Sequence, residues 1–175
     1  MSSTKPGPEA GSDEGGTSTT FVVEPLQAQR FAHAIGDLNP IYFDEAAARA
    51  AGLPGRVAPP TFVPSLHVWD VGSPEAALRA DGVDPGRFPG PIHRDAALLG
   101  GGQELDFVRP VRLGETLVAR PRVVEHHVRE TRAGPLTFVV VETRYTDLDG
   151  EVALLARDTL IARQPAPSAT TEGQR

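Results

Sequence analysis

The chain of 175 residues and 18.6 kDa fits one domain, and its 39% hydrophobic residues are enough for a core. Its 18 glycines and 17 prolines predict many short elements joined by turns, which disfavours a helical bundle. A formal net charge of −6 without clustered basic residues makes nucleic acid a poor partner. The chain has no cysteine, which excludes disulfides, thiolate metal sites and a cysteine nucleophile. Because no apolar run has membrane length and no signal-peptide hydrophobic region is present, we expect a soluble cytoplasmic protein without membrane contact.

The two ends differ in composition from the rest of the chain. Residues 1–19 and 165–175 are rich in small and polar residues and offer almost nothing to bury. We therefore predict a disordered tail at each end and one domain over residues 20–164.

The first part of the domain predicts a short strand followed by a helix. Residues 21–25 are typical of a strand, and Pro25 suits the first turn of a helix. Apolar residues then follow a helical face over residues 26–35, and Gly36 ends the helix.

The next part predicts a second helix and a long excursion. Residues 44–53 fit a short helix that is capped by Asp44 and stopped by Gly52. The apolar segment that follows starts extended before its prolines and becomes helical after Pro60 or Thr61. Residues 71–97 are rich in Gly, Pro, Asp and Arg, and we interpret them as a surface excursion.

The last third changes character. It contains four β-rich runs that are separated by short turns: residues 102–111, 115–130, 136–147 and 151–163. Such runs predict an antiparallel sheet, and the helical material before them makes the fold class α+β, with a helix packed on one curved sheet.

The loop between the two predicted helices carries the most informative polar residues. It brings the carboxylate of Asp37, the amide of Asn39 and the phenol of Tyr42 close to a helix end, which is typical of an active-site rim. The alternative is structural: Asp37 and Asn39 cap the turn, Pro40 stiffens it, and Tyr42 packs its ring. The residues alone leave both interpretations open.

Two separated blocks resemble a known family. The stretch FAHAIGDLNPIYFDEAAARAAGLPGRVAPPTF resembles the start of MaoC-like, R-specific enoyl-thioester hydratases and dehydratases, whose loop reads G-D-x-N-P-h-H-x-D. The blocks GGGQELDFVRPVRLGETL and DLDGEVALLARDTLIAR are similar to later parts of the same family. The A-P-P turn and the G-G-Q-E block are typical of its N-terminal-type subgroup. The resemblance implies a hot-dog fold, in which the sheet wraps a central helix.

The resemblance also implies a reaction, the reversible syn addition of water to a 2-enoyl thioester. The thiol part would be coenzyme A or an acyl carrier protein, and no cofactor or metal is implied. Carried over by position, Asp37 is the catalytic aspartate and Asn39 the asparagine, but Tyr42 stands where the family has its histidine. A phenol with an ordinary pKa near 10 is a weak base at neutral pH, unlike imidazole. Likewise, the family's A-H-G turn is replaced by a turn with Pro59 and Pro60, which have no amide hydrogen to donate.

Three functions remain open, and these departures favour the first of them. In the first, the chain is the non-catalytic half of a dehydratase or hydratase heterodimer whose sister hot-dog chain supplies the Asp-His pair. In the second, it is a self-sufficient homodimeric enzyme that uses Asp37. In the third, it binds acyl thioesters without catalysis.

The remaining candidates are substrate contacts. They are Pro60, Thr61, His67, Gly101, Gly102 and Arg109. For Arg109 we favour a salt bridge to Asp37 or Glu104 over contact with a coenzyme A diphosphate. His126 and His127 are consecutive in a strand, so we expect their rings on opposite faces and no shared metal.

Overall fold

The structure is a computed structural model that describes residues 17–66, 73–79, 82, 84, 92 and 96–163. The predicted tail over residues 165–175, most of the tail over residues 1–19 and most of the predicted excursion therefore lie outside the described residues. His67 also lies outside them.

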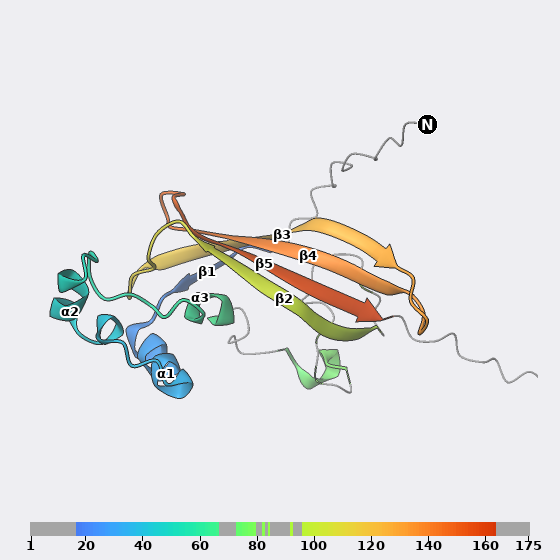
Figure 1. Ribbon diagram of the computed structural model, residues 1–175, viewed down its shortest axis with the longest axis horizontal. Coiled ribbons are helices and arrows are strands. Elements are labelled where there is room, and N and C mark those ends of the chain that lie inside the picture. The colour runs from blue at the N-terminus through green and yellow to red at the C-terminus, as the bar shows by residue number, and fades with distance from the viewer. Residues whose placement is uncertain are drawn as a thin grey trace, which may run out of the picture.

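The described residues form one curled antiparallel sheet. Its strands are β1 (Thr19–Val22), β2 (Ala97–Phe107), β3 (Thr116–Arg129), β4 (Leu136–Thr146) and β5 (Val152–Arg163). They lie in the order β1-β3-β4-β5-β2, with every neighbouring pair antiparallel. The antiparallel sheet predicted from the sequence is confirmed, and its two edges are β1 and β2 (Figure 1).

The helices are short and precede most of the sheet in the chain. They are α1 (Pro25–Ile35), the 3₁₀ turn η1 (Pro40–Tyr42), α2 (Glu45–Ala50), α3 (Phe62–Ser65) and the 3₁₀ turn η3 (Glu75–Ala77). As predicted, α1 begins with Pro25 and ends at Gly36, which adopts a φ of +76° that favours glycine. Asp44 caps α2 by accepting a 2.7 Å hydrogen bond from the N–H of Ala47.

Some boundaries differ from the sequence prediction. β1 begins at Thr19, two residues early, whereas α2 ends at Ala50, just before the predicted stop at Gly52. β2 begins at Ala97, inside the predicted excursion, because the segment that precedes the glycines pairs with the end of β5 up to Arg163. The glycines and prolines of this segment predict a later start for the strand, but pairing with the distant strand β5 extends β2 toward the N-terminus.

The core lies between the inner face of the sheet and the helices. It joins Leu117, Tyr145 and Leu154 of the sheet to Phe62 of α3, and all four side chains are fully buried. The helix begins directly after Thr61, as predicted, and its first turn packs into the concave side of the sheet. This is a hot-dog arrangement, in which the concave side of a curved sheet packs on a helix; Figure 1 shows α3 beside the sheet, on the side where α1 also lies. None of the helices described is long and apolar enough to cross a membrane.

The outer face of the sheet holds one buried carboxylate. Glu142 on β4 is 6% exposed and accepts hydrogen bonds from Arg122 on β3, at 2.6 Å, and from Arg157 on β5, at 3.0 Å. The hydrogen bond from Arg122 is the largest cause that lowers the pKa of Glu142 below its usual value of 4.5, and burial partly opposes it. The three side chains therefore link three neighbouring strands.

We expect Glu142→Gln to lower the free energy of unfolding by about 1–3 kcal/mol at neutral pH, because two charge-assisted hydrogen bonds are weakened. Since the folded pKa lies below 4.5, the stabilisation is present above that pH and is lost as the pH falls through the folded value. Urea unfolding measured from neutral pH downward should therefore show the two stability curves converging in acid. Glu104→Gln, at an exposed carboxylate on β2, is the matched control. Parallel curves for Glu142→Gln and the native chain would contradict the assignment.

Candidate active site

The loop between α1 and α2 brings two of the predicted catalytic side chains into direct contact. The hydroxyl of Tyr42 donates a 3.0 Å hydrogen bond to Oδ2 of Asp37. The left-handed turn at Gly36 directs the chain back, so that the N–H of Asp37 donates to the carbonyl of Ala32 in α1 at 3.0 Å. Asp37 is half-buried, and Tyr42 is 6% exposed. The family loop is thus folded with its aspartate facing the side chain at the histidine position.

The same loop is also held by its own polar side chains. Oδ1 of Asp37 accepts from the N–H of Asn39 at 3.3 Å, and Oδ1 of Asn39 accepts from the N–H of Ile41 at 3.2 Å. The ring of Tyr42 packs in a buried cluster with Ala32. Asn39 is therefore a turn cap, and its amide is exposed. The structural interpretation of the loop describes Asn39 well, while Asp37 and Tyr42 additionally form a polar pair.

The protonation state of Tyr42 decides what this pair can do chemically. Burial, the hydrogen bond to Asp37 and the negative charge of Asp37 together raise the pKa of Tyr42 to about 12. At neutral pH the phenol is therefore a proton donor, and about one molecule in 10⁵ is ionised. Tyr42 can orient a water molecule or the carboxylate, but it cannot accept a proton as imidazole does.

The turn after the loop has two of its amides occupied. The N–H of Ala58 donates to the carbonyl of Val111 at 2.8 Å, and the N–H of Phe62 donates to Pro59 at 3.0 Å. Pro59 and Pro60 have no N–H to offer. Two of the candidate substrate contacts, Pro60 and Thr61, are exposed at this turn. The N–H of Thr61 makes no backbone hydrogen bond among the described residues, so this turn offers a single backbone donor to a thioester carbonyl.

The glycine candidates lie on the edge strand β2. The pairing of β2 with β5 shifts between Gly100 and Gly102, and Gly102 has a φ of +134° that favours glycine. A Cβ at Gly101 would lie 2.7 Å from Cγ2 of Thr159, so no larger residue fits without movement of Thr159. The glycine at position 101 therefore allows the close approach of β2 to β5. No hydrogen bond or buried cluster among the described residues joins these glycines to Asp37.

Arg109 has partners other than the two that the sequence suggested. It lies 3.0 Å from Glu115 and 3.2 Å from Asp147, each distance joining a guanidinium nitrogen to a carboxylate oxygen. The expected salt bridge to Asp37 or Glu104 was wrong, because the turn after β2 carries Arg109 toward the turns before β3 and after β4. These two ion pairs fit a structural arginine, and contact of Arg109 with a coenzyme A diphosphate stays a prediction.

His127 is a sheet residue and lies apart from the Asp37 loop. Its ring stacks on Phe138 with centroids 4.9 Å apart, and Nδ1 lies 3.0 Å from Glu125.

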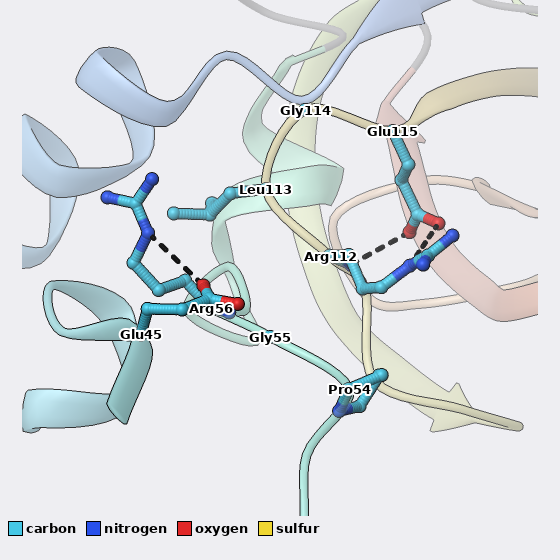
Figure 2. A pocket seen from close by; sticks show the side chains of 8 residues that line it. All are labelled: Glu45, Pro54, Gly55, Arg56, Arg112, Leu113, Gly114 and Glu115. Atoms are coloured by element: carbon cyan, nitrogen blue, oxygen red, sulfur yellow. Dashed lines mark hydrogen bonds and ion pairs between the residues drawn. The ribbon is translucent and has the colours of Figure 1, made fainter. Parts of the chain in front are cut away.

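One surface cleft lies beside the loop region. It has a volume of about 350 Å³ and is lined by Glu45, Pro54, Gly55, Arg56, Arg112, Leu113, Gly114 and Glu115. Figure 2 shows that the side chains of Arg56 and Arg112 point away from each other, each toward a glutamate of its own. Sequence reasoning did not find this cleft. Because its two cations diverge, it offers no convergent anion site.

The fold and the loop define a hot-dog protein of the hydratase and dehydratase class. Comparison with known proteins agrees: residues 14–155 match the family model described as FAS1-like, dehydratase domain region. The chain belongs to this family, and the MaoC-like resemblance is confirmed.

Three individual proteins illustrate the similarity. A UPF0336 protein of Parafrankia sp. (strain EAN1pec) is 32% identical over 149 residues, which cover 84% of this chain and 87% of the relative. A chain of the HadBC (3R-hydroxyacyl-ACP dehydratase) complex of Mycobacterium tuberculosis is 30% identical with a TM-score of 0.62, over 86% of this chain and 98% of that chain. A chain of the ChsH1-ChsH2 complex of the same species is 25% identical with a TM-score of 0.64, over 89% and 87%.

The raised pKa of Tyr42 predicts an unusual titration. The sequence has only two tyrosines, Tyr42 and Tyr145, and burial raises the pKa of both phenols. At pH 10, where an unfolded phenol is half ionised, the folded chain should show almost no phenolate absorbance in the near ultraviolet. Folded-state stability should fall as the pH rises from 10 toward 12, because the unfolded state loses its phenolic protons first.

Asp37→Asn should move one phenolate transition to lower pH, because it removes a negative charge from beside the phenol of Tyr42. Tyr42→Phe serves as the control that identifies this transition, and circular dichroism at each pH separates ionisation from unfolding. An unchanged curve in Asp37→Asn would rule out the pairing of Tyr42 with Asp37.

Proposed function

We propose that this chain is the non-catalytic subunit of a MaoC-like (3R)-hydroxyacyl-thioester dehydratase or 2-enoyl-thioester hydratase, paired with a sister hot-dog chain that supplies the Asp-His pair. The observation that carries the proposal is the hydrogen bond from Tyr42 to Asp37. It places a phenol with a pKa of about 12 where the reaction needs a base.

Hydration requires a group that can take a proton from water while a hydroxyl adds to C3 and a proton adds to C2. An imidazole with a pKa near neutrality can do both steps in turn. The phenol of Tyr42 holds its proton at neutral pH, and its hydrogen bond occupies one oxygen of Asp37. Pro59 and Pro60 also contribute no N–H to the thioester oxygen, which leaves the N–H of Thr61 as the one backbone donor of this turn. Both parts of the chemistry therefore fall to the sister chain, and this chain shapes the acyl site.

The sheet has an open edge that suits a partner chain. β1 covers β3 only over Thr116–Ala119, and within the described part of the chain no strand lies beside residues 120–129 on that side. Val124 and Val128 in this stretch are 41% and 55% exposed. A strand from a sister chain would satisfy the open backbone groups and cover these valines. The two similar structures are themselves complexes, HadBC and ChsH1-ChsH2, which supports a partner.

The substrate of the assembled enzyme is an acyl thioester of coenzyme A or of an acyl carrier protein, and we place the enzyme in the cytoplasm. We expect the chain alone to hydrate crotonyl coenzyme A at no more than background rate. Addition of the sister chain should restore turnover, and in that complex Tyr42→Phe and Asp37→Asn should change kcat by less than about twofold, because neither residue performs the chemistry.

The matched variant is the replacement of the catalytic aspartate in the sister chain, which should abolish turnover. Robust turnover by this chain alone that is lost in Asp37→Asn would establish the self-sufficient enzyme instead. Thioester binding without turnover, whether or not the sister is added, would establish the binding protein.

A further inference from the structure

The apolar stripe of α1 continues past the part of the helix that is buried. Ala28 and Ala32 lie on this stripe and are fully buried, and Phe31 packs against the core beside them. Ile35 follows Phe31 by four residues and Ala32 by three, so it belongs to the same side of the helix. Its side is the core-facing one, and yet Ile35 is 51% exposed.

Leu38 adds a second exposed apolar side chain just past the end of the helix. It is 57% exposed and directly follows Asp37 in the loop. The backbone is held on both sides of it, because the N–H of Asp37 donates to Ala32 at 3.0 Å and the N–H of Asn39 donates to Oδ1 of Asp37 at 3.3 Å. We call three residues the apolar rim: Phe31, Ile35 and Leu38.

The apolar rim adjoins both polar features of the candidate site. Its two exposed members flank Asp37 in the sequence, and Asp37 accepts the hydrogen bond of Tyr42. The ring centroid of Phe31 lies 5.6 Å from that of Phe62, the residue that directly follows Thr61. The N–H of Thr61 is the backbone donor that this turn offers to a thioester carbonyl. The apolar rim therefore reaches from the Asp37 loop to the turn that carries this donor.

We propose that the apolar rim contacts the acyl chain of the thioester substrate, so that Ile35 and Leu38 make affinity rise with acyl length. The ligand class, an acyl thioester, rests on the proposed function; the position of its chain is new. Four residues of helix rise about 6 Å between Phe31 and Ile35, so a longer acyl chain covers more of the apolar rim than a short one.

The size and setting of the apolar rim fit an acyl chain better than a protein. A stable protein interface buries about 800 Å² on each partner. The apolar rim presents three side chains, one of which packs against the core, so it is a small part of such an area. A protein surface laid over it would also take water from the half-buried carboxylate of Asp37. A narrow alkyl chain contacts Ile35 and Leu38 and leaves this carboxylate hydrated.

The test measures how the affinity of the full chain changes with acyl length. Saturated acyl thioesters have no double bond to hydrate, so binding is read without turnover. In isothermal titration calorimetry with butyryl, hexanoyl and octanoyl coenzyme A, affinity should rise about two- to fourfold per added methylene, the upper value being that of full burial. Ile35→Gln and Leu38→Gln should each weaken binding of octanoyl coenzyme A about fourfold and that of butyryl coenzyme A by less than about twofold.

Leu26→Gln is the matched control. Leu26 is also 57% exposed on α1, but it precedes Ile35 by nine residues, which is about two and a half turns and places it on the opposite side of the helix. This variant should leave every affinity within about twofold. All three replaced side chains are exposed, and circular dichroism of each variant confirms that the fold is retained.

The proposal is overturned if octanoyl coenzyme A does not bind at millimolar concentration, if affinity is independent of acyl length, or if Leu26→Gln weakens binding as much as Ile35→Gln. Self-association of the chain that Leu38→Gln abolishes, measured by analytical ultracentrifugation, would show that a second copy covers the apolar rim and would also overturn it. The assay of the proposed function uses the sister chain and crotonyl coenzyme A, so its failure leaves the length dependence unchanged. The two failures are therefore distinguishable.

Discussion

One face of the curved sheet must be covered by apolar side chains, and the rest of the structure depends on that requirement. Tyr145, Leu154 and Leu117 fill the concave side together with Phe62 of α3. Because side chains alternate along a strand, this covering fixes the register of every rung. The same alternation sends Arg122 and Arg157 outward and buries Glu142 between them. Core packing and surface charge are therefore two results of one register.

The α1–α2 loop is attached to this sheet through a second, smaller cluster. Val57 packs against Tyr42 on one side and pairs with Arg112, beyond the end of β2, on the other. A displacement of the loop would thus be resisted by backbone pairing to the sheet as well as by its own caps. Within this anchored loop the phenol of Tyr42 stands at the family's histidine position and contacts Asp37.

Much of the fold could be predicted from the sequence because local signals and tertiary packing agree. The helix start at Pro25, its end at Gly36 and the cap at Asp44 depend on neighbouring residues alone. The start of β2 could not be predicted, because it depends on pairing with β5, some 60 residues farther along the chain. One partner of Arg109 was missed for the same reason: Asp147 is distant in sequence and reaches Arg109 only through the turn between β4 and β5. The other, Glu115, is near in sequence, but it faces Arg109 only because the chain turns between β2 and β3.

In the candidate site, too, features set by neighbouring residues could be predicted from the sequence, and features set by distant residues could not. The spacing of Asp37 and Tyr42 predicts their proximity, and the hydrogen bond between them confirms it. The sequence does not predict the size of the pKa change of Tyr42, because burial in the cluster with Val57 is its largest cause and Val57 lies beyond α2. Burial and the adjacent carboxylate act in the same direction on a phenol, whereas on an imidazole burial lowers the pKa and the carboxylate raises it. In this environment both effects keep the proton on the phenol of Tyr42, so at neutral pH the side chain at the family's histidine position donates a hydrogen bond to Asp37.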